Sequence, residues 1–215
     1  MPLKIAHRGY CNNHTSNTIN SIKDAICNDF DMIEIDIQLD KNDNIIVYHD
    51  TYYKNKPIDT YSYNELKKDI PDLLLFSDIF KSVDYKNVKF YLDLKGSDNI
   101  AYRLHTFFVQ LNIDTKNIWI GSFNINHIEI LNTRNRYYKL GLITDNNYTI
   151  DILSTIVKSY DLEFVSFEWT MLNNNSIQYL KNKHIMVFIY TIKNIDTLMF
   201  IKHYNIDGIV SDVLI

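Results

Sequence analysis

The sequence predicts an α/β fold in which parallel strands alternate with helices. Short apolar runs rich in β-branched residues recur along all 215 residues, and an amphipathic stretch follows most of them. Continuous apolar strands of this kind are typical of a parallel sheet that helices cover. No run rich in Gly, Ser or Pro divides the chain, so we expect one domain over residues 1–215.

The apolar runs define eight strands in chain order. They cover Leu3–His7, Met32–Ile37, Val88–Leu94, Asn117–Gly121, Lys139–Ile143, Phe164–Phe167, Ile185–Thr191 and Gly208–Val210. The stretches with helical periodicity cover residues 17–29, 98–112, 125–134, 149–159, 173–183 and 194–204. Polar residues suited to cap a helix begin four of them, at Ser97-Asp98, Asn124, Thr149 and Asn194.

An insertion follows the second strand. Residues 45–48 read as an extra strand after the turn at residues 41–44. The segment 51–75 then breaks the alternation, and we expect a loop with one short helix around residues 63–69.

Eight strands in alternation with helices favour a closed (β/α)8 TIM barrel, with a doubly wound open sheet as the competing architecture. The chain is short beside the ~250 residues typical of such barrels. Its last strand lies so near Ile215 that no clear final helix is predicted.

The bulk composition excludes several classes of protein. A net charge of -4 argues against a nucleic-acid backbone binder. Two cysteines, Cys11 and Cys27, make no disulfide framework, and we expect ordinary thiols. Neither a signal peptide nor an apolar run of membrane-spanning length is evident, so we expect a soluble cytoplasmic protein.

Three carboxylates are predicted to meet at one end of the barrel. Glu34 and Asp36 are two residues apart on a strand and therefore share a face, and Asp93 ends the next strand of the alternation. Because the active site of such a barrel lies at the carboxyl ends of its strands, these side chains suit one divalent cation. Oxygen ligands favour Mg²⁺ or Ca²⁺, and Mn²⁺ also fits.

Two histidines and two cations occur at the same strand ends. His7 and His49 can exchange protons near neutral pH, so one can deprotonate a nucleophile while the other protonates a leaving group. Arg8 and Lys95 offer positive charge to phosphate oxygens. The alternative role for Arg8 is an ion pair with Asp212 or Asp36. We expect structural or surface roles for the other histidines: His14, His105, His127, His184 and His203.

These residues resemble those of the glycerophosphodiester phosphodiesterase family. The matching segments run in the family's order over nearly the whole chain. They are Ala6-His7-Arg8-Gly9, Asn17-Thr18, residues 33–39, Val47-Tyr48-His49-Asp50, Tyr91-Leu92-Asp93-Leu94-Lys95, Ser122-Phe123, Tyr190-Thr191 and residues 207–212.

The resemblance implies hydrolysis of glycerophosphodiesters to sn-glycerol 3-phosphate and an alcohol. It makes the two histidines the acid–base pair, the three carboxylates the metal ligands, and Arg8 and Lys95 the groups that face the phosphate.

The sequence departs from the family's pattern at four positions. Ser16 replaces a Glu, and Asp93 replaces a Glu that is longer by one methylene. Tyr190 replaces a Trp but still offers an aromatic face to the substrate. The family's Asn aligns with Lys193, or with Asn194 after a slip of one residue.

Two alternatives stay open. The first is a lipid phosphodiesterase, such as a lysophospholipase D or a sphingomyelinase D-like enzyme acting on a membrane lipid. Tyrosines 52, 53, 61 and 63 would then form an apolar entrance for an acyl chain. The second is a catalytically silent barrel that binds a phosphorylated ligand, for which the changes at Ser16 and Asp93 are the best support.

Overall fold

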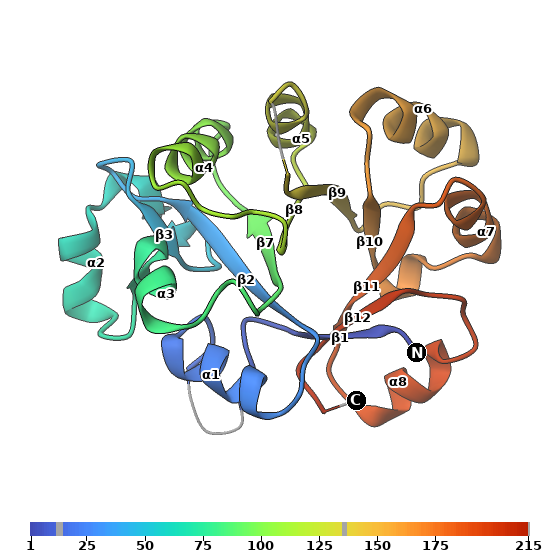
Figure 1. The fold of residues 1–215 in the computed structure, drawn as a ribbon, viewed down its shortest axis with the longest axis horizontal. Helices are drawn as coiled ribbons and strands as arrows, with labels where there is room; N and C mark the ends of the chain where they lie inside the picture. Colours follow the sequence, from blue (N-terminus) through green and yellow to red (C-terminus); the bar gives the residue numbers. More distant parts are fainter. Residues whose placement is uncertain (12–14, 135–136, 215) are drawn as a thin grey trace.

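The computed structural model describes residues 1–11, 15–134 and 137–214, and it contains a closed barrel of eight parallel strands. Each strand pairs with the next, and β1 pairs with both β12 and β2, which closes the ring (Figure 1). The closure confirms the predicted barrel over the open sheet. The strands are β1 (Leu3–Ala6), β2 (Met32–Leu39), β7 (Phe90–Leu94), β8 (Ile118–Ser122), β9 (Lys139–Thr144), β10 (Phe164–Glu168), β11 (Met186–Ile192) and β12 (Gly208–Ser211).

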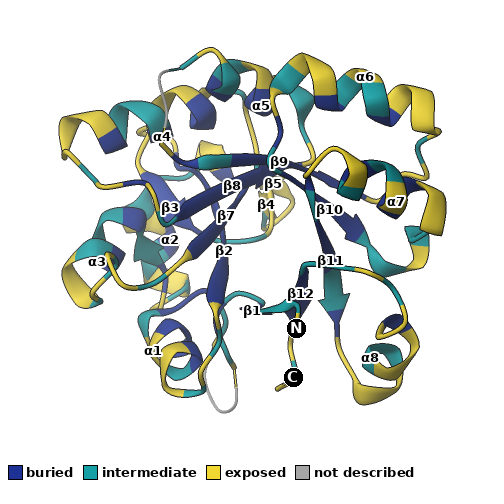
Figure 2. Ribbon diagram, turned by 45° about the vertical axis from the view of Figure 1, so that its right-hand side comes forward, coloured by how far each residue is buried: buried dark blue, intermediate teal, exposed yellow. Residues whose placement is uncertain are grey.

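Helices surround this barrel, and their exposed residues lie on the sides that face away from it (Figure 2). Those expected from periodicity all form. They are α1 (Ile19–Cys27), α4 (Asn99–Gln110), α5 (Ile125–Asn132), α6 (Ile150–Tyr160), α7 (Asn174–Asn182) and α8 (Ile195–Ile201), and a 3-10 turn, η2 (Trp169–Met171), precedes α7. Side chains of Asn124, Thr149 and Asn194 accept hydrogen bonds from backbone amides of the first turn, as predicted. Asp98 makes no such bond and instead accepts one from Asn124 Nδ2, at 2.8 Å.

The insertion after β2 is more ordered than the sequence predicts. Its elements are β3 (Ile45–Val47), β4 (Tyr52–Tyr53), β5 (Lys56–Pro57), η1 (Ile58–Thr60), α2 (Tyr63–Asp69), β6 (Leu74–Leu75) and α3 (Phe76–Ser82). β3 runs antiparallel to β2 and extends the barrel sheet. The predicted short helix is α2. The sequence analysis did not predict α3, whose N-cap residue Leu75 makes no side-chain capping hydrogen bond.

No helix follows β12 in the part of the chain that the structure describes, which agrees with the prediction. The barrel closes through backbone pairing of β1 with β12, with a register that runs from Leu3↔Gly208 to Ala6↔Ser211. A groove of about 510 Å³, lined by Leu3, Leu198 and Ile209 among others, lies on the outer side of this pair next to α8.

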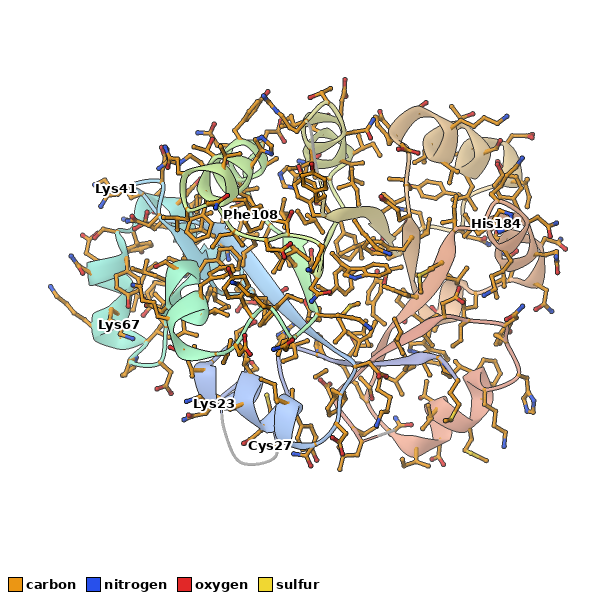
Figure 3. All side chains as sticks on the ribbon, viewed as in Figure 1. Lys23, Cys27, Lys41, Lys67, Phe108 and His184 are labelled. Atoms are coloured by element: carbon orange, nitrogen blue, oxygen red, sulfur yellow. The ribbon has the colours of Figure 1, made fainter. Side chains whose placement is uncertain are left out.

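The core has two parts, one between barrel and helices and one inside the barrel. The outer part is large and aliphatic, and Phe108 of α4 lies within it, whereas Lys23, Lys41 and His184 project from the periphery (Figure 3). The inner part holds several aromatic rings, including Trp119, Phe164 and Phe188. Burying apolar side chains on both faces of the strands is what stabilises the closed sheet.

Glycines on the strands make room for these rings. A Cβ atom at Gly141 would lie 2.4 Å from the ring of Phe164, and one at Gly208 would lie 2.6 Å from Phe188. Close packing of the barrel interior therefore depends on small residues opposite large ones.

Cys11 and Cys27 are both free and exposed, as expected. Among the described residues, no helix combines the length and the apolar character needed to cross a bilayer.

Candidate active site

A cavity of about 130 Å³ opens at the carboxyl ends of the barrel strands. It brings together all eight residues that the sequence analysis selected. Its lining comprises His7, Arg8, Glu34, Asp36, His49, Tyr91, Asp93, Lys95, Phe123, Ile143, Ser166, Tyr190, Thr191 and Val210.

His7 follows β1 and is held by an aspartate from the neighbouring strand end. Its Nδ1 lies 2.6 Å from Oδ1 of Asp212, directly after β12. Burial would raise the pKa of Asp212, but the hydrogen bond and charge of His7 outweigh it and hold that pKa below its ordinary value. An ionised aspartate at Nδ1 orients the imidazole and leaves Nε2 as its proton-exchanging nitrogen.

His49 follows β3 and has a similar partner but a more open position. Its Nδ1 lies 2.7 Å from Oδ1 of Asp50. The side chain of His49 is 40% exposed, against 16% for His7. Gln38 fixes this loop, because its Nε2 donates to the carbonyl oxygens of Tyr48 and Asp50 at 2.7 and 3.0 Å.

The three predicted metal ligands lie together and are buried. Asp36 on β2 pairs in register with Asp93 on β7. Glu34 precedes Asp36 by two residues and therefore lies on the same face of β2. One carboxylate oxygen of each lies within 4.8 Å of the other two. Burial and the neighbouring carboxylates raise the pKa of Glu34 well above its ordinary value. Three carboxylates confined in this way require a compensating cation or proton.

Two side-chain cations already contact this cluster. Lys95 Nζ lies 2.5 Å from Asp93 Oδ2 and 3.3 Å from Asp36 Oδ1. Arg8 Nε lies 3.2 Å from Asp36 Oδ2, so the ion pair considered for Arg8 is present. Burial lowers the pKa of Lys95, but Asp93 and Asp36 more than offset this and raise it. Burial raises the pKa of Asp93 to about 7, although Lys95 opposes that shift.

The cluster fits a hard divalent cation. Asp93 Oδ1 is buried and accepts no hydrogen bond, which leaves a lone-pair direction for a ligand. The donor atoms are all carboxylate oxygens, which suit Mg²⁺, Ca²⁺ or Mn²⁺. With such an ion, the three carboxylates and the two side-chain cations would leave one net positive charge to balance a phosphodiester.

The loop after β1 positions both Arg8 and Asp36. Asn17 donates from Nδ2 to Asp36 Oδ2 at 2.9 Å and accepts from the Asp36 amide at 3.2 Å. Gly9 has a φ of +76°, and a Cβ there would lie 2.5 Å from Ser21 Oγ. Ser21 in turn donates to the Arg8 carbonyl at 3.0 Å, which ties the loop to α1. The role of Asn17 in holding Asp36 was not predicted from the residues themselves, because it depends on a contact across 19 positions.

Two aromatic side chains form part of the cavity wall. Phe123 and Tyr190 meet edge to face with ring centroids 5.8 Å apart, and Lys95 Nζ lies 5.2 Å from the Phe123 ring. Tyr190 therefore offers a ring to the cavity, as its position on the seventh barrel strand suggests. The sequence analysis did not select Phe123 as a lining residue.

The tyrosines of the insertion do not line this cavity. Tyr53, Tyr61 and Tyr63 pack into a small core with Ile58 and Leu66 of the same segment. A separate cavity of about 160 Å³ adjoins the site and shares Arg8 and His49 with it. Ser16 lines this second cavity.

The remaining described histidines lie outside the cavity lining. His127 is fully buried, and its ring contacts Ser122 Oγ at 2.9 Å and the Ser97 carbonyl at 3.2 Å. It therefore links the loops that follow β7 and β8, which is a structural role. His184 and His203 are exposed. The expectation for His14 lies outside the described residues.

Comparisons with known proteins agree with this geometry. The model of the glycerophosphoryl diester phosphodiesterase family matches residues 7–215. The chain belongs to this family. Its members are phosphoric diester hydrolases, so this protein is an enzyme of that class.

Individual relatives are distant but cover at least 97% of this chain. YhdW of Bacillus subtilis (strain 168), which is named for the same activity, is 25% identical over 97% of this chain and 93% of its own. The crystal structure of a glycerophosphodiester phosphodiesterase from Thermotoga maritima superposes with a TM-score of 0.82 at 20% identity, covering 99% of this chain and 95% of its own. An Oleispira antarctica phosphodiesterase in complex with the product sn-glycerol-3-phosphate gives 0.85 at 16% identity, covering 100% and 94%. These structures show the shared fold.

Proposed function

We propose that this protein hydrolyses glycerophosphodiesters to sn-glycerol 3-phosphate and an alcohol. The observation that carries the proposal is one cavity lined by two histidines, each in contact with an aspartate, beside a buried cluster of three carboxylates. Family membership supports the reaction class, and the complex of the Oleispira antarctica protein supports a glycerol phosphate product.

The proposed catalytic pair is His7 and His49. One imidazole takes the proton of the attacking hydroxyl as its oxygen bonds to phosphorus, and the other gives a proton to the alkoxide as the bond from phosphorus to the leaving oxygen breaks. Water or a hydroxyl of the substrate would use the same two groups. Asp212 and Asp50 contact Nδ1 of the two imidazoles and so hold their orientation.

Glu34, Asp36 and Asp93 are the residues proposed to hold one divalent cation, Mg²⁺, Ca²⁺ or Mn²⁺. A cation there would supply positive charge to the phosphoryl oxygens. Arg8 and Lys95 extend that positive charge on the same side of the cavity, which stabilises the charge that develops in the transition state.

The test is hydrolysis of glycerophosphocholine by purified protein. We expect turnover after chelation and reloading with one of the three metals, and a loss of about 10²–10⁴ in kcat when His7 or His49 is replaced by Ala. His203→Ala, on the exposed surface, is the matched control and should keep full activity.

Undiminished hydrolysis by His7→Ala and His49→Ala would exclude the acid–base pair. Full activity after exhaustive chelation would exclude the metal site. Binding of sn-glycerol 3-phosphate without turnover under every metal would instead identify a silent barrel.

A further inference from the structure

The buried imidazole of His127 links two loops that each carry a residue of the active-site cavity. Backbone pairing of β7 with β8 ends at Leu94↔Ser122. Lys95 and Phe123 come one residue later, and both line the cavity. Their side chains meet there, with Lys95 Nζ 5.2 Å from the centre of the Phe123 ring. Because the pairing of these two strands stops short of both residues, other contacts must fix how the two loops lie relative to each other.

His127, in the first turn of α5, contacts both loops. Its Nε2 lies 3.2 Å from the carbonyl oxygen of Ser97, two residues after Lys95. Its Nδ1 lies 2.9 Å from Oγ of Ser122, which precedes Phe123. The residue is only 1% exposed, so the ring has little access to water. One imidazole therefore spans the gap between the residues that follow β7 and those that end β8.

The acceptors around Nε2 fix the tautomer of this ring. The Ser97 carbonyl can only accept a hydrogen bond, and Oδ1 of Asp98 lies 3.7 Å from Nε2. Burial lowers the pKa of His127, although the Ser97 carbonyl and Asp98 oppose that shift. The neutral ring therefore carries its hydrogen on Nε2 and donates it to Ser97, which leaves Nδ1 to accept from the Ser122 hydroxyl.

A second pair of strand ends shows what a serine contributes by itself. Ser122 Oγ lies 3.1 Å from the carbonyl oxygen of Leu94, the last residue of β7. Ser211 Oγ, at the end of β12, likewise lies 3.1 Å from the carbonyl oxygen of Ile192, the last residue of β11. In both places the serine hydroxyl joins two strand ends. What His127 adds is a contact beyond the strand, in the loop that follows β7.

A network of exposed side chains supports the same link. Asp98 begins α4, and its carboxylate accepts from Asn124 Nδ2 at 2.8 Å and from Asn126 Nδ2 at 3.2 Å. These contacts also join the start of α4 to the start of α5. The Asp98 side chain is 48% exposed, so water competes for its hydrogen bonds, whereas those of His127 are buried. We therefore expect the buried contacts to provide most of the constraint.

We propose that His127 is a positioning residue for hydrolysis, and that it holds the Lys95 ammonium against the carboxylate cluster and beside the Phe123 ring. This inference rests on the function proposed above. Lys95 Nζ lies 2.5 Å from Asp93 Oδ2 and 3.3 Å from Asp36 Oδ1. A lysine side chain is long and flexible, so the place of its charge depends on a backbone that is itself fixed.

Displacement of Lys95 should matter more for the transition state than for substrate binding. Negative charge on the phosphoryl oxygens grows as the attacking oxygen bonds to phosphorus, and a cation stabilises it best when it is already in place. Misplacement of a positioned group by about 1 Å can cost roughly 10²-fold in rate. Loss of the His127 contacts should therefore lower kcat more than it raises KM.

The experiment compares two substitutions of His127 in hydrolysis of glycerophosphocholine. His127→Leu fills the space of the ring but removes both polar contacts. His127→Gln carries an amide nitrogen that can take the place of Nε2 and donate to the Ser97 carbonyl. We expect kcat of His127→Leu to fall about 10–100-fold while KM changes less than about threefold. His127→Gln should keep kcat within about fivefold of the wild type. Equal losses in the two variants would contradict the role of the contact with Ser97.

Ile128→Ala is the matched control for a purely structural effect on the same helix. Ile128 is fully buried in the outer core, so its truncation should lower the melting midpoint. Well below that midpoint, this variant should keep kcat within about twofold of the wild type. If Ile128→Ala loses as much kcat as His127→Leu, loss of stability explains both effects and the proposal is overturned.

A double-mutant cycle tests whether His127 acts through Lys95. Lys95→Met removes the ammonium group, so no cation remains there to be positioned. Adding His127→Leu to Lys95→Met should then cost less than about a further threefold in kcat, because residues that act together are not additive. Fully additive losses would overturn the assignment, since His127 would then act on something other than Lys95.

The outcomes separate this inference from the proposed function. If the wild type cleaves glycerophosphocholine and His127→Leu keeps its kcat, the proposed function stands and the inference fails. If the wild type does not cleave it, the proposed function fails, and calorimetry with sn-glycerol 3-phosphate tests His127 alone. His127→Leu should then weaken binding about as much as Lys95→Met does, and His127→Gln should bind like the wild type. Equal binding by the wild type and His127→Leu would overturn the inference.

Discussion

Toward the amino ends of the strands, the barrel interior is filled by the rings of Trp119, Phe164 and Phe188, whose centroids lie 5.0–5.4 Å apart. Tyr91 of β7 pairs in register with Trp119. Two residues beyond Tyr91 on β7 lies Asp93, and its partner in register on β2 is Asp36. The first region is buried and closely packed, so its side chains stabilise the fold. The second confines like charges at a cost to stability, which is the usual price of a site that must bind a cation and an anion.

The largest expected effect on stability belongs to the aromatic region. Phe164 is fully buried and contacts the rings of Tyr91, Trp119 and Phe188. Phe164→Ala should lower the free energy of unfolding by about 3–5 kcal/mol, because a cavity replaces the ring. Chemical denaturation measures this change. The exposed Phe200→Ala is the matched control, with a change of less than about 1 kcal/mol. Equal effects of the two substitutions would contradict the account of the inner core.

In the charged region, we expect one substitution to raise the stability of the protein and to abolish its activity. Glu34→Gln removes one of three confined carboxylates but keeps an oxygen that can accept from the Arg8 amide, now 2.8 Å from Glu34 Oε2. In the metal-free protein, we expect the free energy of unfolding to rise by about 1–3 kcal/mol. Activity and metal binding should be lost. Thermal melts and metal titration measure the two quantities.

The exposed Glu129→Gln on α5 is the control for Glu34→Gln, and it should change neither quantity. A Glu34→Gln protein that is less stable than the wild type without metal would contradict the idea that these charges strain the fold.

A third expected effect is a pH dependence of the metal-free protein. Burial raises the pKa of Asp93 from 3.8 to about 7, so the folded state binds a proton that the unfolded state has released between those values. Stability from this group therefore falls as pH rises from about 4 to about 7, by at most ~1.4 kcal/mol per pH unit. Melting midpoints of chelated protein at pH 5, 6 and 7 measure it.

Asp93→Asn is the variant that isolates this pH dependence. It should flatten the decline in the melting midpoint relative to the wild type. A wild-type midpoint that does not fall more steeply than that of Asp93→Asn would show that Asp93 does not titrate in this window. Restoring the divalent cation should reverse the trend, because the cation favours the ionised carboxylates.

Local pattern was enough to predict most of the barrel. The alternation of Ile33, Ile35 and Ile37 with Glu34 and Asp36 indicated which side chains face the interior, because successive residues of a strand point to opposite faces. Capping residues located helix starts for the same local reason. The helix α3 was missed because Leu75 offers no capping side chain.

The residues of the candidate site were predicted from the sequence as a set, because carboxyl ends of parallel barrel strands converge. Most of their partners were not, apart from the Arg8–Asp36 ion pair that was considered as an alternative. Asp212 reaches His7 across 205 positions, and Asn17 reaches Asp36 across 19, so no local pattern reports either contact. The contact of His7 with Asp212 depends on the closed ring, whereas Asp50 is the neighbour of His49 in the chain.

The sequence by itself determined the alternation of strands and helices, the face on which each carboxylate lies and the presence of two histidines at strand ends. These follow from periodicity and residue type, which are local. Only the tertiary structure decided that β12 closes on β1 to bring Asp212 to His7, and that Lys95 and Arg8 already contact the carboxylates. Each of these depends on where distant strands place their side chains once the ring is closed.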